Sequence, residues 1–491
     1  MNGQLVGDRL GLGREGYPIV LAQPPVDHGV RSLFTFHKNK GIGAKPPQAL
    51  MILGTCLKDA GFGQIELIDA QLEELSPAAL AERIAQASPS LVGLTVWTDF
   101  WYPAWETVRH LRKRLPDVRI VLGGPHCSIY PAETLEASDA DYVVAGDGEL
   151  TMVRLTEALS RGEAPGDLPG LWRKREGKIL APEVARAEVE SIDSVPIPDR
   201  TLLDYRRYGS VLNAEDYETT MITSRGCPHK CVFCKMFTQK VCARSAAQVV
   251  EEFRRVAELG IRDIQVYDDT FTWSKQRVMD ICNGILDLGL DVRWAIRDRV
   301  SKADPEMYAL LRKAGCYRIH FGVESGSPPI LAASGKGITL EQAEDAVRFA
   351  KEAGMDTLAF YMFGFLEETL QDAGKTIDFS KRLDTDYAAF AVLIPYPGTK
   401  IYQQAMERGI IAEDFWRGFT LSPEPDFLVP RFIEDVLTRE ELIKLKNRAQ
   451  FQYYFRWSRI WRELRAATTP KGFMDRAGMA WNILSDYLHG S

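Results

Sequence analysis

Short apolar runs alternate with amphipathic segments over the first third of the chain. The runs are PIVLAQ, IELIDA, LVGLTV, RIVLGG and DYVVAG, and the amphipathic segments include 47–60, 103–115 and 149–159. Near-continuous apolar strands, each followed by a helix, are typical of a parallel sheet covered on both faces. The pattern predicts an α/β protein whose residues 17–165 form a doubly wound, Rossmann-like domain.

A second alternating series begins at Thr219. Its strands are predicted at TTMITS, IQVYD, VRWAI, RIHFGV, TLAFYMF and YAAFAVLI, with helices between them. Six strand–helix units are too few for the eight-fold barrel. We therefore predict a partial (β/α)6 barrel over 213–410. Between the two domains, residues 166–212 are expected to hold a short hairpin, GLWRKREGKILAP, and a proline-containing linker.

The C-terminal region, 411–491, reads as helical, aromatic and basic. Between Lys444 and Arg476 there are nine Lys or Arg residues against two acids. Aromatic and aliphatic residues recur there at helical spacing: Tyr453, Trp457, Ile460, Trp461 and Leu464. One interpretation is a helix that packs across the barrel. The other is a surface that meets a membrane or a hydrophobic substrate.

Composition narrows the class of protein. A chain of 491 residues with 45% hydrophobic and 26% charged residues suggests two or three globular domains. The longest apolar runs are too short to span a membrane, and the first sixteen residues lack the features of a signal peptide. The net charge of −7 argues against general nucleic-acid binding. Eight cysteines, three of them within eight residues, fit a reducing cytoplasm.

The most specific chemical signal is the segment Cys227-Pro-His-Lys-Cys231-Val-Phe-Cys234. Electron-carrying iron–sulfur clusters normally use four cysteine thiolates. Three cysteines in one short segment would hold three irons of a [4Fe-4S] cluster and leave the fourth iron to a small molecule. The alternative is a zinc site with His229 as fourth ligand. Zinc sites usually add a distant second pair of ligands, and the sequence offers no such pair.

This motif, with Phe233 directly before the last cysteine, resembles that of the radical S-adenosylmethionine (SAM) superfamily. The resemblance implies that the amino and carboxylate groups of SAM chelate the open iron. An electron from the cluster then cleaves SAM to a 5′-deoxyadenosyl radical, which the protein shields and orients. Phe233 would pack near the adenine.

The ends of two later strands carry candidates for the polar end of SAM. Asp268 and Asp269 stand where the superfamily often has a Gly-Gly-Glu segment that binds the SAM amino group. An Asp after a strand is also an ordinary helix cap. Arg297 could pair with the SAM carboxylate, and Arg299 is an equal candidate.

Two further strand ends resemble the superfamily in the same order. Phe321-Gly-Val-Glu324-Ser325-Gly326 resembles the segment that contacts the SAM ribose or amino acid, through Glu324 or Ser325. YMFGF places Gly364 where the backbone would approach adenine.

A doubly wound domain ahead of such a barrel resembles the cobalamin-binding branch of the superfamily. The residues that carry this resemblance follow the third, fourth and fifth strands: Thr95, Val96 and Trp97; Gly123, Gly124 and His126; and Gly146, Asp147, Gly148 and Glu149. All are predicted at carboxyl ends of parallel strands, where such sheets bind ligands. Glycines there would let the corrin or its nucleotide tail come close.

The lower face of the cobalamin is expected to lack a histidine. Many cobalamin proteins supply one from D-x-H-x-x-G, but none of the seven histidines has an Asp two residues before it. Cobalamin should therefore bind base-off and without a histidine ligand. Trp97 would shield that face, and His126 would contact the nucleotide tail.

The resemblance is closest to the branch containing anaerobic magnesium-protoporphyrin ester cyclase and cobalamin-dependent methyltransferases. It implies methyl transfer to an unactivated carbon through methylcobalamin and the adenosyl radical. The alternatives are oxidative cyclisation or ring rearrangement without net methylation and, outside enzymes, a corrinoid or electron carrier. We expect a small-molecule substrate between the domains, lined by the interdomain linker, the loop near Trp273 and the C-terminal helices. The aromatic residues of that region, Phe415, Trp416, Phe419 and those between Phe451 and Trp461, favour a hydrophobic or planar substrate. Flavodoxin or ferredoxin is the expected electron donor.

Overall fold

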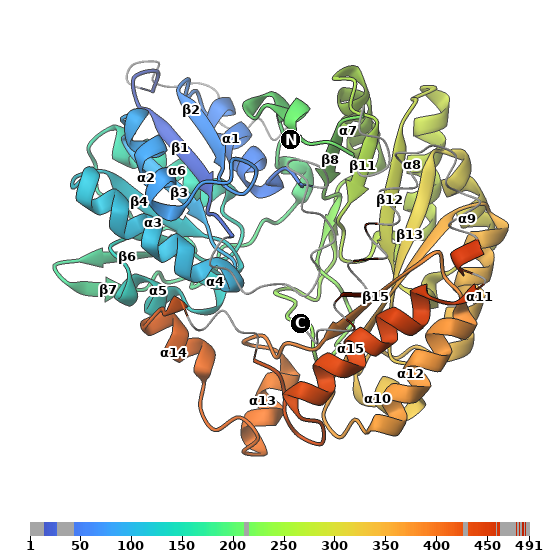
Figure 1. The fold of residues 1–491 in the computed structure, drawn as a ribbon. Coiled ribbons are helices and arrows are strands. Elements are labelled where there is room, and N and C mark those ends of the chain that lie inside the picture. The colour runs from blue at the N-terminus through green and yellow to red at the C-terminus, as the bar shows by residue number, and fades with distance from the viewer. Residues whose placement is uncertain are drawn as a thin grey trace.

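The computed structural model describes residues 14–26, 44–210, 216–425, 431–457 and 459–461, with a few isolated positions after 477. Two sheets, each flanked by helices, lie side by side (Figure 1). The N-terminal sheet occupies one half of the molecule and the second sheet the other. The predicted α/β class and the order of its parts are confirmed.

The N-terminal sheet has the strand order β2-β1-β3-β4-β5-β6-β7. Its strands are β1 (Ile19–Gln23), β2 (Ile65–Asp69), β3 (Leu91–Thr95), β4 (Arg119–Gly123), β5 (Tyr142–Val144), β6 (Leu171–Arg175) and β7 (Lys178–Leu180). The first five pair in parallel, as the apolar runs predict. The predicted hairpin is present as β6 and β7, and it extends this sheet because β6 pairs antiparallel with β5.

Helices cover both faces of the N-terminal sheet (Figure 1). They are α1 (Gln48–Asp59), α2 (Pro77–Gln86), α3 (Trp101–Arg114), α4 (Pro125–Ile129), α5 (Pro131–Ala137) and α6 (Glu149–Ser160). The two faces bury separate hydrophobic clusters, one around Val20, Leu94 and Leu122 and one around Leu21, Met51 and Val121. Burial on both faces explains why these strands are almost continuously apolar.

The second sheet has the order β15-β14-β13-β12-β11-β8, with all neighbours parallel. Its strands are β8 (Glu218–Met221), β11 (Asp263–Val266), β12 (Arg293–Asp298), β13 (Cys316–Glu324), β14 (Asp356–Phe363) and β15 (Tyr387–Val392). The helices that follow them are α7 (Ala246–Glu258), α8 (Lys275–Asp287), α9 (Pro305–Lys313), α10 (Pro328–Ala333), α11 (Leu340–Glu352) and α12 (Leu370–Leu383). Because β8 and β15 are the two edges in this order, the barrel is partial, as predicted.

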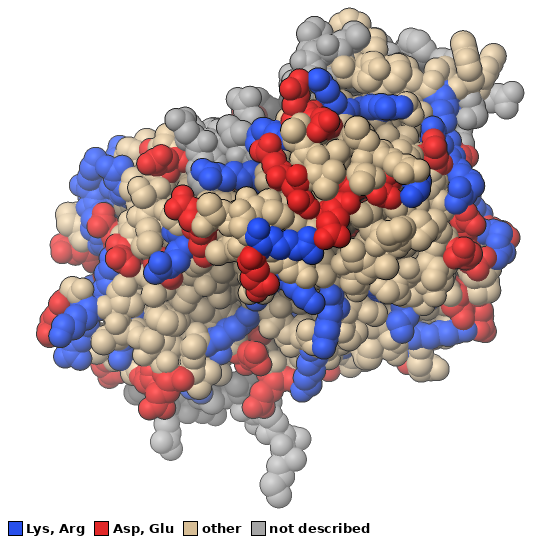
Figure 2. Space-filling model, turned by 90° about the horizontal axis from the view of Figure 1, so that it is seen from below, with Lys and Arg blue, Asp and Glu red and all other residues tan. Residues whose placement is uncertain are grey.

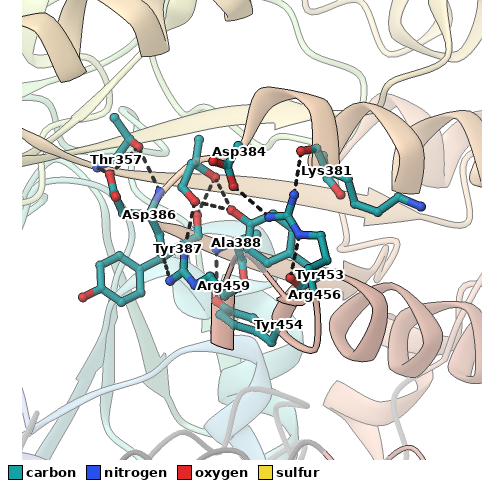
Figure 3. A network of polar contacts seen from close by, with 12 residues as sticks. Thr357, Lys381, Asp384, Asp386, Tyr387, Ala388, Tyr453, Tyr454, Arg456 and Arg459 are labelled. Atoms are coloured by element: carbon teal, nitrogen blue, oxygen red, sulfur yellow. Dashed lines mark hydrogen bonds and ion pairs between the residues drawn. The ribbon is translucent and has the colours of Figure 1, made fainter. Parts of the chain in front are cut away.

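The edge strand β15 is covered by the C-terminal helix α15 (Arg439–Tyr454). The Tyr454 hydroxyl bonds both the N–H and the carbonyl of Ala388, which replaces a neighbouring strand at that point. Arg456 bonds Asp384 at 2.9 Å, and Arg459 reaches the Thr385 carbonyl (Figure 3). Part of the predicted C-terminal helix thus packs across the barrel, and covering the edge blocks pairing with other chains.

The aromatic side chains just beyond that helix point outward. Trp457 is 78% exposed and Trp461 is 59% exposed. None of the described helices combines the length and apolar content that crossing a membrane requires. On the face in Figure 2, Lys and Arg side chains are interspersed with Asp and Glu side chains.

The chain returns to the N-terminal domain after the barrel. Helices α13 (Lys400–Glu407) and α14 (Phe415–Leu421) follow β15, and α14 packs against α5 (Figure 1). The Trp101 indole N–H donates to the Thr420 carbonyl at 3.1 Å, and the Tyr130 hydroxyl donates to Asp414 at 3.1 Å. These buried contacts join the two domains into one body.

Candidate active site

The three motif cysteines lie on one loop between the short strands β9 (Ser224–Arg225) and β10 (Cys242–Ala243), just after β8. Val232, between the second and third cysteines, donates its N–H to the Ser334 carbonyl and accepts from the Ile401 N–H, both at 2.9 Å. These bonds tie the loop to segments that follow β13 and β15. The loop therefore sits over the carboxyl end of the barrel, where barrel enzymes keep their chemistry.

The thiols have different surroundings. Cys227 Sγ lies 3.7 Å from the Thr270 hydroxyl, and Arg299 Nη1 points at Cys231 Sγ from 4.0 Å. Cys227 and Cys231 are half-buried, whereas Cys234 is exposed. The described residues hold no group of three His, Cys, Asp or Glu side chains that converge on a single metal ion. Each thiolate of a four-iron cluster binds a different iron, so its three sulfurs need not meet at one point.

The two aspartates after β11 have separate roles in the structure. Asp268 is buried, and both of its carboxylate oxygens accept hydrogen bonds from the N–H and hydroxyl groups of Thr223 and Ser224. It joins the end of β11 to the start of the cysteine loop. Asp269 accepts the Gly226 N–H at 3.0 Å, and its side chain is otherwise accessible. Asp269 is thus the carboxylate that a bound ammonium could reach.

The two arginine candidates also separate. Arg297 is exposed, and its guanidinium lies 4.0 Å from the centre of the Tyr267 ring. Arg299 is buried, bonds Ser301 Oγ at 3.0 Å and reaches Cys231. Of the two arginines, Arg299 is the one that contacts a motif cysteine.

Glu324 ends β13 in an unusual backbone conformation. Its φ is +70°, and its carboxylate bonds Lys336 Nζ at 2.5 Å. A Cβ on Gly322 would lie 2.3 Å from both charged groups, so the glycine leaves room for the pair. Strained residues of this kind cluster at functional sites. Ser325 is fully buried and bonds Thr376 Oγ1 at 3.0 Å, so its hydroxyl is taken up inside the protein.

The loop after β14 is held by a buried acid. Gly364 has φ +96°, and its N–H donates to Glu368 Oε2 at 2.6 Å, as does that of Phe365 at 3.1 Å. Burial raises the pKa of Glu368 to about 7. Phe365 meets Phe233 edge to face, with ring centres 5.8 Å apart. The predicted adenine-binding residues therefore lie together.

The predicted cobalamin residues follow β3, β4 and β5 at the carboxyl edge of the N-terminal sheet, and we call this edge the crest. Val96 donates its N–H to the Gly123 carbonyl at 2.7 Å, joining the loops after β3 and β4. Gly124 has φ +108°, and a Cβ there would lie 2.8 Å from the Val96 carbonyl oxygen. Trp97 is 54% exposed and Thr95 ends β3. The crest thus has a tightly packed floor and one exposed aromatic ring.

His126 is at the crest but turns inward. Its ring is fully buried and stacks on Trp101, with centres 4.9 Å apart. Neither ring nitrogen has a hydrogen-bond partner among the residues that the structure describes, and burial lowers the pKa of His126 to about 3. The ring is therefore neutral, and in this structure it has no exposed surface through which it could meet the nucleotide tail.

The GDGE segment after β5 forms an ion-pair cluster that the sequence did not reveal. Arg225 bonds Asp147 at 3.0 Å and Glu149 at 2.5 Å. Arg225 lies two residues before Cys227, and both acids belong to the crest. In the sequence, only the position of Arg225 just before the cysteine motif could have indicated a role for this residue. We call these three side chains the interdomain bridge.

The aromatic cluster near residue 416 does not line an open site, and that prediction was wrong. Phe415, Trp416 and Phe419 are buried, and the Trp416 indole N–H donates to the Pro395 carbonyl at 2.7 Å. They share a hydrophobic cluster with Trp101 of α3. Their spacing resembled a substrate surface because the sequence does not show what a short helix packs against.

The residues present fit the expected cofactors. Three thiols share one loop beside the Arg299 guanidinium, and accessible Asp269 and Arg297 lie at neighbouring strand ends. Across the interdomain bridge, the crest offers the exposed indole of Trp97 and the glycine backbone at Gly124. Arg225 joins the loop after β5 to the start of the cysteine loop, so cofactors bound at the two loops would be neighbours.

Comparison with known proteins agrees with this arrangement. Residues 221–380 match the radical SAM superfamily and residues 43–156 match the B12 binding domain. An uncharacterized methyltransferase of Pyrococcus horikoshii is 34% identical over 444 residues, which are 89% of this chain and 92% of the relative. The anaerobic magnesium-protoporphyrin IX monomethyl ester cyclase of Rubrivivax gelatinosus is 27% identical over 432 residues, 84% of this chain and 76% of the relative.

A solved structure shows the same architecture. The radical SAM methyltransferase TsrM from Kitasatospora setae, with cobalamin and a [4Fe-4S] cluster bound, matches with a TM-score of 0.65 and 25% identity. The match covers 80% of this chain and 79% of that one. The alternative of a carrier without a substrate of its own is set aside, since these relatives are enzymes. The chain belongs to the radical SAM superfamily, as a cobalamin-dependent enzyme with a B12-binding domain ahead of its barrel.

Proposed function

We propose that this enzyme transfers a methyl group to an unactivated carbon of a small molecule. The observation that carries the proposal is the interdomain bridge, which joins the crest directly to the cysteine loop. A substrate at this interface would meet a 5′-deoxyadenosyl radical from one side and cobalt-bound methyl from the other. The cofactors supply the radical and the methyl group, and the protein supplies their relative position.

The barrel residues have distinct roles in this proposal. Cys227, Cys231 and Cys234 bind three irons of the cluster. Asp269 accepts from the SAM ammonium, supported by its accessibility, while Asp268 braces the loop.

The remaining SAM contacts follow from the other strand ends. Arg299 pairs with the SAM carboxylate, with Arg297 as the alternative. Glu324, next to Ser325, faces the ribose or amino acid. Phe233 and Gly364 adjoin the adenine, supported by the contact between Phe233 and Phe365.

The crest binds cobalamin in its base-off form without a histidine ligand. His126 supports this proposal because its ring stacks on Trp101 in the core and does not extend from the crest. Trp97 covers the lower face, supported by its exposure. Thr95, Val96, Gly123, Gly124, Gly146 and Gly148 contribute backbone surface around the corrin or its tail. A cobalt(II) EPR spectrum without nitrogen superhyperfine splitting would support this arrangement, and triplet splitting from an imidazole would contradict it.

Methyl transfer is favoured over cyclisation because the more similar relative is described as a methyltransferase and matches over 89% of this chain. Similarity to the cyclase of Rubrivivax gelatinosus supports oxidative cyclisation as the alternative reaction. We further propose a flavodoxin or ferredoxin electron donor, a cytoplasmic location and a substrate that is not a nucleic acid. The exposed Trp457 and Trp461 support a peripheral contact with a membrane or a hydrophobic substrate.

The test is anaerobic reconstitution with iron, sulfide and cobalamin, followed by reduction in the presence of SAM and mass spectrometry. We expect both 5′-deoxyadenosine and S-adenosylhomocysteine. Deoxyadenosine without S-adenosylhomocysteine, from protein that retains cobalamin, would favour the cyclisation or rearrangement alternative.

A further inference from the structure

Arg225 connects the crest and the cysteine loop through two carboxylates. One arm of its guanidinium, Nη1, bonds Asp147 Oδ1, and the other, Nη2, bonds Glu149 Oε1. The side chains of Arg225 and Glu149 are only 24% and 10% exposed, so water competes little for these bonds. Charge-assisted bonds in a partly buried place are stronger and more directional than surface ion pairs.

The crest side of the bridge is fixed in place. Asp147 also accepts the Val189 N–H at 2.9 Å through its second oxygen, and its own N–H donates to the Ala187 carbonyl at 2.9 Å. Gly146 has φ +95°, and a Cβ there would lie 2.1 Å from that same carbonyl oxygen. The position of the carboxylate is therefore set by backbone on both sides.

The barrel side is equally constrained. Arg225 pairs with Cys242 across β9 and β10, and the next residue, Gly226, donates to Asp269 at 3.0 Å. Gly226 has φ +90°, and a Cβ there would lie 2.3 Å from the Lys240 carbonyl oxygen. Cys227 follows directly. The backbone from Arg225 to Cys227 therefore has little freedom to move relative to the Asp147 carboxylate.

We infer that Arg225 is a positioning residue that sets the distance and orientation between the SAM-binding loop and the cobalamin domain. The inference rests on the proposed function, because only a reaction that crosses the interface needs this distance. SAM cleavage occurs on the barrel alone. Methylation of cob(I)alamin takes place across the interface. The bond between the methyl carbon and the sulfur of SAM breaks, the cobalt electron pair forms the new bond to that carbon, and S-adenosylhomocysteine leaves.

The fork of an arginine suits this role and a lysine does not. Two carboxylates from different residues are met by two separate nitrogens held in one plane. A lysine ammonium is a point charge that would neutralise one acid without fixing the angle. Arg225→Lys should therefore restore only part of what Arg225→Met loses.

The experiment compares two reactions of the reconstituted holoenzyme without substrate. SAM, cobalamin and titanium(III) citrate are supplied, and 5′-deoxyadenosine and S-adenosylhomocysteine are measured together. The matched control is Arg417→Met, because Arg417 makes another interdomain ion pair, with Glu133 at 2.8 Å, between α14 and α5. Asp147→Asn removes the bridge from the other side and guards against a folding defect in one variant.

For Arg225→Met and Asp147→Asn we expect S-adenosylhomocysteine formation to fall about 10- to 100-fold, the effect of roughly 1 Å of misplacement. Deoxyadenosine formation should stay within about threefold of the unmodified enzyme, and Arg417→Met should change neither. Hydrogen exchange provides a readout that does not depend on activity. Peptides covering 146–149 and 224–234 should exchange faster in Arg225→Met and not in Arg417→Met.

Two outcomes would overturn the inference. One is an unchanged product ratio in Arg225→Met while the unmodified enzyme forms both products. The other is unchanged hydrogen exchange of both peptides in Arg225→Met, which would mean that the bridge does not hold the two loops. S-adenosylhomocysteine is counted per bound cobalamin, so weaker cofactor binding is not mistaken for misplacement. If the unmodified enzyme forms deoxyadenosine but no S-adenosylhomocysteine, the proposed methylation fails instead, and the two failures are distinguishable.

Discussion

The hydroxyl of Tyr396 donates a 2.7 Å hydrogen bond to Asp99 Oδ2 across the two domains. Asp99 lies in the loop after β3, two residues beyond Trp97, and Tyr396 lies in the loop after β15. The Tyr396 ring also stacks on Trp416, with centres 5.7 Å apart. The loop that carries the proposed lower-face residue is thus held by the last loop of the barrel.

Replacing Tyr396 by Phe should destabilise the protein by about 1–3 kcal/mol, because both Asp99 oxygens would then lack a partner. The pKa of Asp99 is already raised by burial, and the Tyr396 hydroxyl opposes that rise. The loss should therefore be largest where the carboxylate is charged and should shrink as the pH falls through the raised pKa of Asp99. Urea unfolding across a series of pH values measures it. An equal loss in Tyr387→Phe, a change on an exposed side chain, would contradict the assignment.

Cys231→Ala should abolish both cluster assembly and SAM cleavage. Two remaining thiolates cannot hold a site-differentiated four-iron cluster. Iron and sulfide content, EPR after reduction and deoxyadenosine yield check this. Cys242→Ala is the control, because Cys242 lies nearby in β10, where its thiol contacts the Glu190 carbonyl. Deoxyadenosine from the Cys231→Ala protein would mean that the cluster ligands lie elsewhere.

Gly226→Ala should weaken the cysteine loop. The residue has φ +90°, which costs a side chain about 1–3 kcal/mol, and the new Cβ would collide with the Lys240 carbonyl. We expect lower iron content after reconstitution and a lower melting temperature. Gly177→Ala has a similar φ of +76° but open space around it. If the two variants bind iron equally well, the collision has no consequence for the cluster site.

Arg299→Met should raise the KM for SAM by about 10- to 100-fold if its guanidinium pairs with the SAM carboxylate, the range for a charge-assisted hydrogen bond. The measurement is deoxyadenosine formation against SAM concentration, in protein with equal iron content. The matched comparison is Arg297→Met, because Arg297 lies two residues earlier, in β12. A larger effect in Arg297→Met would transfer the role to Arg297.

Glu368 should make stability depend on pH. Its pKa is raised from 4.5 to about 7 by burial, so the folded state holds its proton while the unfolded state has released it. Linkage then lowers the free energy of unfolding as pH rises from about 4.5 to about 7, by roughly 3 kcal/mol, and leaves this contribution constant above. Below pH 4.5 both states are protonated and the penalty is absent.

Glu368→Gln keeps an acceptor for the Gly364 and Phe365 N–H groups and removes the charge. Its free energy of unfolding should exceed that of the unmodified protein at pH 8, and the difference should shrink towards pH 5. Glu367→Gln, on the exposed neighbouring side chain, should not show this convergence. Parallel curves for the unmodified protein and Glu368→Gln would show that burial does not perturb this acid.

Sequence patterns located the elements well because each depends on local physics. Buried parallel strands must be apolar on both faces, so PIVLAQ and RIVLGG are recognisable without any tertiary information. The three-cysteine spacing lies within one loop and needs no distant partner. The same holds for the glycines after β4 and β5, whose positive φ is a local requirement of the backbone.

Partnerships between distant residues were decided only by the tertiary structure. Nothing local distinguishes Arg297 from Arg299, yet one stacks on Tyr267 and the other reaches Cys231. Asp268 and Asp269 are adjacent, but strand geometry turns one into the interior and the other towards open space. Helix α14 likewise packs against the N-terminal domain through Phe415, Trp416 and Phe419, a contact that the local sequence does not show.

The sequence by itself determined the fold class, the order of the domains, the cysteine motif and the family. It could do so because apolar periodicity and short-range spacing are written in consecutive residues. Only the tertiary structure decided that Arg225 joins Asp147 and Glu149, that Tyr396 holds Asp99, and that His126 turns into the core. Hydrogen bonds and ion pairs depend on distances of a few ångströms between segments far apart in the chain, and no local pattern encodes those distances.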